Sequence, residues 1–269
     1  MQHPLDHALH LVPVGLDGFA GATSPAYANM VGPFGGTTAA VLLQAALKHP
    51  ARLGDPIALT VNYASALADG AFHITARPVR TNRSTQHWSI ELLQGGEVAA
   101  TATAVFAVRR DTWSATEAVP PRDVPAATAL PRAPLEGRPP WVHGYDMRFI
   151  EGGMPDTFDG QEQPQSTSRL WVRDEPPRAL DFGALAALCD SFFPRIFVRR
   201  RQRGAIGTVS LTTYFHAGPD QLAAQGERHL FGVARALNYR AGYFDQTAEV
   251  WGDDGTMLAS THQIVYFKD

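Results

Sequence analysis

Two matching stretches of the sequence are Gly95-Gly96-Glu97-Val98-Ala99-Ala100-Thr101-Ala102 and Asp254-Gly255-Thr256-Met257-Leu258-Ala259-Ser260-Thr261. In each, a glycine-containing turn leads into a long run of apolar and small polar residues, which is typical of a strand that follows a hairpin turn. A match between a segment in the middle of a chain and one near its end indicates an internal repeat. The sequence therefore predicts two copies of one structural unit.

The elements around these stretches also occur twice in the same order. Residues 34–47 form an Ala/Leu-rich segment that starts at glycines and predicts a helix, and a second helix is predicted over residues 182–193. Apolar and polar side chains alternate over residues 88–93, the period of a half-buried strand. A helix followed by strands, given twice, favours an α+β fold over a parallel α/β sheet. The predicted strands are residues 57–63, 72–79, 88–93 and 98–108 in the first copy, and 145–150, 169–173, 207–215, 230–239, 243–251 and 257–267 in the second.

A proline-rich segment separates the two copies. Seven prolines occur between residues 120 and 140. Proline removes a backbone donor and interrupts both helices and ladders, so this segment reads as a connector. The predicted organisation is a first half over residues 1–110, a linker over 111–141 and a second half over 142–269.

Length, charge and cysteine content limit the classes of function. A chain of 269 residues fits two small units or one large domain, and its net charge of −3 argues against nucleic-acid or anionic-membrane partners. The single cysteine, Cys189, excludes an intrachain disulfide and a cysteine-rich zinc site. The N-terminus lacks the basic and apolar regions of a signal peptide, and no stretch has the ~18 apolar residues of a membrane span. We therefore expect a cytoplasmic protein.

Several short motifs follow one another in the order and spacing of a known family. The sequence resembles the acyl-CoA thioesterase II family and its thioesterase-like bacterial relatives. The motifs that carry the resemblance are Ser24-Pro25-Ala26-Tyr27, Gly32-Pro33-Phe34-Gly35-Gly36, Tyr145-Asp146-Met147-Arg148-Phe149, Leu170-Trp171-Val172-Arg173, Leu188-Cys189-Asp190-Ser191, Gly207-Thr208-Val209 and Ser260-Thr261-His262-Gln263.

The resemblance implies a double hotdog, in which two long helices are each wrapped by an antiparallel sheet. It also implies an acyl-CoA substrate, no cofactor or metal, and a catalytic trio of Asp190, Thr208 and Gln263. The sequence departs from the family member compared in one place, because Ser210 and Leu211 follow Val209 where that member has Asp-His-Ser after its threonine.

Two of these residues also stand out without the resemblance, because the periodicity of the sequence places them on apolar faces. Helical spacing places Asp190 on an apolar stripe, where it is either a surface acid at a helix end or a carboxylate directed into a cleft. Gln263 lies on a mostly apolar strand face whose counterpart in the first copy is Ala104, while Leu43 corresponds to Asp190. Burying an amide costs about 1–3 kcal/mol unless it is paired, so Gln263 needs a partner, either a backbone group or a positioned water.

Hydrolysis of a thioester would suit these residues. It requires a placed water, a group that accepts the water proton and donors for the developing oxyanion. Asp190 would be the base, Thr208 and Gln263 would hold the water, and backbone N–H groups at a helix start would face the oxyanion. Direct attack by Asp190 through an anhydride is the alternative.

Glycines and arginines supply candidate substrate contacts. Gly35 and Gly36 begin the first predicted helix, but their spacing matches no phosphate-loop motif. Arg199, Arg200 and Arg201 form a basic cluster beyond the second predicted helix, which is either a solvated loop or an anchor for the phosphates of coenzyme A.

Two other functions compete with hydrolysis. A hotdog enoyl-CoA hydratase would need an Asp and His pair, but the sequence has no Asp-x-Asn-Pro-x-His. A non-catalytic acyl-CoA-binding protein would keep the groove and tolerate the loss of Asp190. The scattered histidines include no His-Glu-x-x-His, and Cys189 reads as a buried thiol in a helix. Because exposed sheet edges are usually paired, we also expect a homodimer.

Overall fold

The computed structural model describes residues 2–268 and contains a single antiparallel sheet with helices on its inner face. The helices are α1 (Pro4–Ala8), α2 (Gly35–Lys48), α3 (Pro140–His143), α4 (Phe182–Leu188), α5 (Arg195–Arg200) and α6 (Pro219–Gln225). Strands of the first half are β1 (Val12–Val14), β2 (Gly18–Ala22), β3 (Asp55–Tyr63), β4 (Ala71–Thr81), β5 (Thr85–Gln94) and β6 (Glu97–Ala107). Those of the second half are β7 (Tyr145–Glu151), β8 (Ser168–Asp174), β9 (Ile206–Phe215), β10 (Leu230–Arg235), β11 (Tyr239–Arg240), β12 (Tyr243–Trp251) and β13 (Met257–Phe267).

The order of strands repeats with approximate two-fold symmetry. It runs β1-β2-β4-β5-β6-β3 and continues as β9-β13-β12-β10-β8-β7, with β11 added to β12. Strands β3 and β9 pair at the centre, where the Thr60 and Thr212 hydroxyls lie 3.0 Å apart. The predicted α+β class and antiparallel pairing are confirmed, and the two halves share one continuous sheet.

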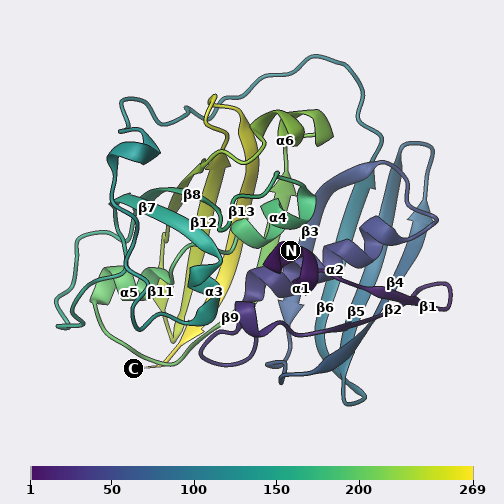
Figure 1. Cartoon of the computed structure of the whole chain (residues 1–269), viewed down its shortest axis with the longest axis horizontal. Helices are drawn as coiled ribbons and strands as arrows, with labels where there is room; N and C mark the ends of the chain where they lie inside the picture. The colour runs from purple at the N-terminus through teal and green to yellow at the C-terminus, as the bar shows by residue number, and fades with distance from the viewer. Residues whose placement is uncertain (1, 269) are drawn as a thin grey trace.

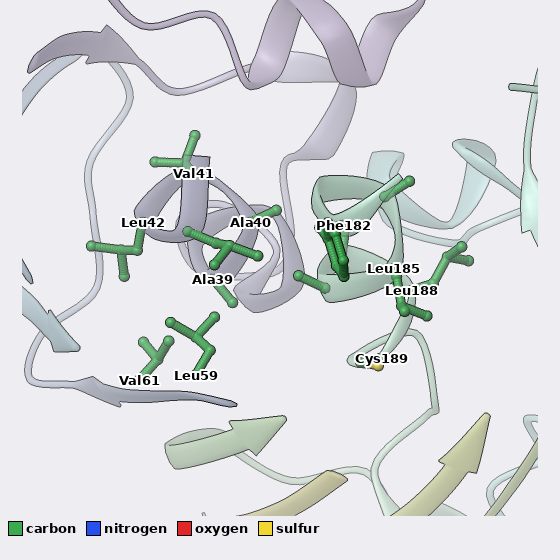
Figure 2. Close-up of a cluster of buried hydrophobic side chains, with 14 of the residues drawn as sticks. Ala39, Ala40, Val41, Leu42, Leu59, Val61, Phe182, Leu185, Leu188 and Cys189 are labelled. Atoms are coloured by element: carbon green, nitrogen blue, oxygen red, sulfur yellow. The ribbon is translucent and has the colours of Figure 1, made fainter. Parts of the chain in front are cut away.

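Helices α2 and α4 lie side by side in front of this sheet (Figure 1). Figure 2 shows the two helices next to each other, with Leu59 and Val61 of β3 beneath α2. Alanines and glycines in both helices allow the backbones to approach closely, and the leucines Leu42, Leu43, Leu185 and Leu188 are buried. Each fully buried leucine contributes on the order of 1.5–3 kcal/mol relative to an exposed one.

The second helix is shorter than predicted, so the expectation of two long helices is wrong for this half. Helix α4 starts at an Asp181 cap, whose Oδ1 accepts from the Ala184 N–H at 2.8 Å, and ends at Leu188. Pro194 lacks the N–H needed for a helix over 182–193, and its ring would clash with the carbonyl of residue 190. Asp190 therefore lies in the turn after α4 instead of on a helical stripe.

The proline-rich connector crosses the top of the molecule in Figure 1 with little regular structure. It contains one short 3₁₀ turn, Ala127–Ala129. Arg109 anchors its start by donating to the Phe215 carbonyl of β9 at 2.8 Å, and the Trp171 indole of β8 donates to the Pro125 carbonyl at 2.8 Å. Within residues 2–268, no helix is both long and apolar enough to cross a bilayer.

Candidate functional site

A cavity of about 480 Å³ lies where the start of α2 meets the turn after α4. Strands β9, β12 and β13 supply one of its walls. Asp190, Thr208 and Gln263, which come from three separate parts of the chain, all line it. The structure thus brings the three predicted residues to a single site.

Asp190 is the central charged group of this site and is only 9% exposed. Its Oδ1 accepts a hydrogen bond from Gln263 Nε2 at 2.8 Å, and the backbone N–H of Gly36 also donates to the carboxylate. A side-chain carbon at Gly35 would stand 2.8 Å from Asp190 Oδ2, so the close approach needs glycine there. The carboxylate also lies at the positive end of the α2 dipole, which favours its charged form.

The protonation of Asp190 is set by competing effects. Burial raises its pKa from the ordinary value of 3.8 to about 7, and the hydrogen bonds from Gln263 and Gly36 oppose this rise. A carboxyl group with a pKa near neutrality is well suited to accept and release a proton in catalysis.

Gln263 lies on the inner face of β13 and is 3% exposed. An ionised carboxylate can only accept, so the Gln263 amide must turn its NH₂ group towards Asp190. The amide that was expected to need a partner has a side-chain one. Its oxygen is then available as an acceptor towards the cavity.

Thr208 reaches the cavity because of a β-bulge. The register between β9 and β13 runs from Ser210 opposite Ile264 to Thr208 opposite Val265, so that Val209 has no partner. Strict alternation from the buried Leu211 would have placed Thr208 on the outer face. The extra residue reverses the alternation, as bulges near active sites often do.

Two residues that line the cavity, Tyr63 and Gln246, and one behind its wall, Arg195, were not predicted from the sequence. The Tyr63 hydroxyl donates to the Gly35 carbonyl at 2.8 Å, and burial together with the Asp190 charge raises its pKa. Gln246 lies directly opposite Gln263 on β12, and Arg195 donates to it from behind the cavity wall. Gln246 had a detectable signal, since it is a polar residue on the apolar face of residues 243–251.

The predicted basic cluster lies apart from the residues that line the cavity. Arg199 forms an ion pair with Glu162 at 3.2 Å, and Arg201 forms one with Asp159 at 3.3 Å. Arg200 lines a separate and smaller hollow. These contacts hold the loop between β7 and β8 against the end of α5. Cys189 is buried, and burial raises the pKa of its thiol.

Solved structures similar to this chain share its fold over the whole length. A conserved protein of unknown function with a hot dog fold from Alicyclobacillus acidocaldarius is 49% identical, with a TM-score of 0.94 over 100% of this chain and 99% of that one. A putative thioesterase II from Thermobifida fusca is 18% identical, with a TM-score of 0.82 over 98% and 97% of the two chains. An acyl-CoA thioesterase II from Mycobacterium marinum is 16% identical, with a TM-score of 0.76 over 98% of each chain.

Family models extend the comparison to sequence. The acyl-CoA thioesterase N-terminal domain matches residues 24–107, and the acyl-CoA thioesterase C-terminal domain matches residues 115–267. No curated protein sequence matches the chain. The two domain matches follow the two halves of the sheet and together cover most of the molecule. The chain belongs to the acyl-CoA thioesterase family.

Proposed function

We propose that this protein hydrolyses the thioester of acyl-CoA to a free acid and coenzyme A. The observation that carries the proposal is the buried Asp190–Gln263 pair, which faces the cavity at the start of α2. Membership in a thioesterase family supports the reaction class. We place the activity in the metabolism of acyl lipids and, given the single cysteine, in the cytoplasm.

In the proposed reaction, ionised Asp190 accepts a proton from a bound water molecule. The water oxygen forms a bond to the acyl carbon, and the carbonyl electron pair moves onto the carbonyl oxygen. When the intermediate collapses, the C–S bond breaks, sulfur leaves with the electron pair, and the proton held by Asp190 passes to it. Water and thioester are thus converted into acid and thiol without another reactant.

The neighbouring residues have supporting roles in this scheme. The Gln263 amide oxygen accepts the second O–H of the water, and the Thr208 hydroxyl donates to the water oxygen and orients it. Backbone N–H groups at Gly35 and Gly36 add positive potential from the start of α2. The chain that follows Arg201 reaches the cavity wall at Gly204. We therefore propose that Arg199, Arg200 and Arg201 interact with coenzyme A phosphates outside the cavity.

Release of free thiol from a panel of acyl-CoA thioesters tests this function. Wild-type protein is expected to release thiol, and Asp190→Asn should lower kcat by about 10²–10⁴-fold because it removes the basic oxygen and keeps the shape. Asp174→Asn is a matched control, since burial raises the pKa of that carboxyl to about 7 as well but it does not line the cavity.

The control variant should keep wild-type turnover, and thermal melting should show that both variants are folded. Hydration of an enoyl-CoA with its thioester intact would identify a hydratase. Binding without either reaction would identify a carrier. Near wild-type turnover in folded Asp190→Asn would disprove the role of Asp190.

A further inference from the structure

Arg195 is a fully buried cation next to the proposed active site. It is 0% exposed, and it donates to the Phe193 and Ser166 carbonyls, the Ser168 hydroxyl and the Gln246 amide oxygen. All of these acceptors are neutral, and within residues 2–268 no carboxylate forms an ion pair with the guanidinium. Burial lowers the pKa of Arg195 only to about 10, so it remains charged at neutral pH. Its charge is therefore uncompensated.

This cation fixes the orientation of Gln246. Arginine has only donors, so the atom of Gln246 that faces Arg195, at 3.2 Å, must be its oxygen Oε1. The NH₂ group then points away from Arg195. Because Gln246 is 2% exposed and lines the cavity, its NH₂ group is available on the cavity side. A hydrogen bond from a charged group also polarises the amide and makes its N–H groups stronger donors.

Gln246 and Gln263 form a complementary pair on one wall of the cavity. They are direct partners in the β12–β13 ladder, where facing side chains are about 4.5–5.5 Å apart at Cβ. Asp190 fixes Gln263 with its oxygen free, and Arg195 fixes Gln246 with its NH₂ group free. One amide therefore offers an acceptor and the other offers donors.

The pseudo-symmetry of the fold shows that this pair is specific to the second half. In the first half, the corresponding pair in the β5–β6 ladder is Trp88 and Ala104, both buried and without this chemistry. Both halves need an inner face that fills the core, so two amides are not required for packing. Burying them costs free energy that only a polar partner offsets.

We propose that Gln246 is a donor to the thioester carbonyl oxygen and to the oxyanion that forms from it, and that Arg195 is its positioning residue. The inference rests on the proposed function and adds the group that stabilises the negative charge. The backbone N–H of Gly36 is engaged by Asp190, which leaves the Gln246 amide as a side-chain donor in the cavity. A hydrogen bond that strengthens as the oxyanion develops accelerates the reaction itself.

Substitution of Gln246 tests this role through turnover. Gln246→Met removes the donors at similar volume, and Gln246→Glu removes them while keeping an acceptor for Arg195. Both should lower kcat by about 10²–10³-fold, the usual effect of losing one oxyanion donor, with a smaller change in KM. A fall in kcat in Gln246→Met but not in Gln246→Glu would mean that Gln246 acts only by holding Arg195. That result would overturn the proposal.

Gln86→Met is the matched control for buried amides. Gln86 is 1% exposed on β5, and its amide bonds to Leu53 N–H, the Ala51 carbonyl and the Thr81 hydroxyl, away from the cavity. Its loss should reduce thermal stability and leave kcat unchanged. A fall in kcat equal to that of the Gln246 variants would show that any buried amide has the same effect, which contradicts a specific role.

A binding measurement separates this inference from the proposed hydrolysis. The probes are the octyl thioether of coenzyme A and its ketone analogue, in which one methylene separates the carbonyl from sulfur, so that neither is hydrolysed. Wild type should bind the ketone about 3- to 10-fold more tightly than the thioether, and Gln246→Met should bind the two probes equally. No preference in wild type, or an unchanged one in the variant, would overturn the inference. Absence of thiol release by wild type would refute only the proposed function.

Discussion

Asp190 combines burial with two hydrogen-bond donors, and these act on its proton in opposite directions. Burial favours the neutral acid, while Gln263 and the Gly36 N–H favour the carboxylate. Burial prevails, because removal of a carboxylate from water is only partly offset by two donors. The group is therefore divided between its two protonation states near neutral pH.

Activity should follow the ionisation of Asp190. The kcat of wild type is expected to rise about tenfold per pH unit below a pH of about 7 and to level off above it, because only the carboxylate accepts the water proton. Steady-state thiol release measured from pH 5 to 9 would check this. A flat profile over that range would mean that no group with such a pKa controls the reaction.

Stability should change in the opposite direction over the same range. The pKa of Asp190 is higher in the folded chain than its ordinary 3.8, so the folded state holds the proton more tightly than the unfolded state. This contribution is complete below pH ~4 and is lost as pH rises to about 7, with an upper limit of ~4 kcal/mol. The free energy of unfolding, measured with urea, should fall less between pH 5 and pH 8 in Asp190→Asn than in wild type. An equal fall in both proteins would contradict the raised pKa of Asp190.

Sequence patterns identified buried polar residues better than they identified their partners. Gln263 was recognised as an amide on an apolar face, and Asp190 as an acid in an apolar segment. Gln246 carried the same signal, and Arg195 lies within an apolar run, but their meaning depends on contacts across 51 positions of sequence. Periodicity reports which face is buried and contains no information about which side chain lies opposite it.

At the scale of elements, the close meeting of α2 and α4 builds the site. A side-chain carbon at Gly36 would lie 2.5 Å from the Ala187 carbonyl oxygen. The start of one helix therefore contacts the end of the other through backbone atoms. This contact brings the turn that carries Asp190 against the first amides of α2.

Gly36→Ala should lower the free energy of unfolding by about 1–3 kcal/mol, since overpacking against backbone outweighs the better helix propensity of alanine. Gly183→Ala is the control, because Gly183 is likewise the second residue of its helix, but a side-chain carbon there would meet side-chain atoms and no backbone, the nearest being the tip of Leu9 at 2.9 Å and Asp181 Oδ1 at 3.3 Å. That variant should be close to neutral in urea unfolding. A similar fall in the free energy of unfolding in both variants would show that the contact with Ala187 does not cause the destabilisation of Gly36→Ala.

Most strands followed from the sequence, while local irregularities did not. The predicted strand over residues 257–267 coincides with β13, since long alternating runs fix the buried face. The hairpin of β1 and β2 was missed because it is short and rich in glycine. The end of α4 and the bulge at Val209 were also missed. A bulge depends on the partner strand, so one strand's periodicity cannot reveal it.

At the scale of the molecule, the sheet ends in β1 on one side and β7 on the other. Strand β1 is exposed along its whole length, and unpaired edges are usually covered. We therefore expect a homodimer, and light scattering at micromolar concentration should give twice the chain mass of 29.2 kDa. A mass equal to that of one chain would contradict this expectation.

We expect the proposed division into residues 1–110, 111–141 and 142–269 to describe a repeat and not two independent folding units. The halves share the β3–β9 ladder at the centre of the sheet, and α2 packs against α4 across the same plane. Separating them would expose both a buried strand edge and the helix interface. We therefore expect the two halves to unfold together.

Hydrogen exchange followed by mass spectrometry can test this cooperativity. The slowest amides of β5 and β6 should open with the same free energy as those of β12 and β13, within about 1 kcal/mol, because both are released only when the shared sheet unfolds. Urea should lower the two values in parallel, and circular dichroism should show a single transition at the same concentration. The amides of one half could instead exchange while those of the other half stay protected. Each half would then have its own stability, and the β3–β9 ladder would join two separate domains.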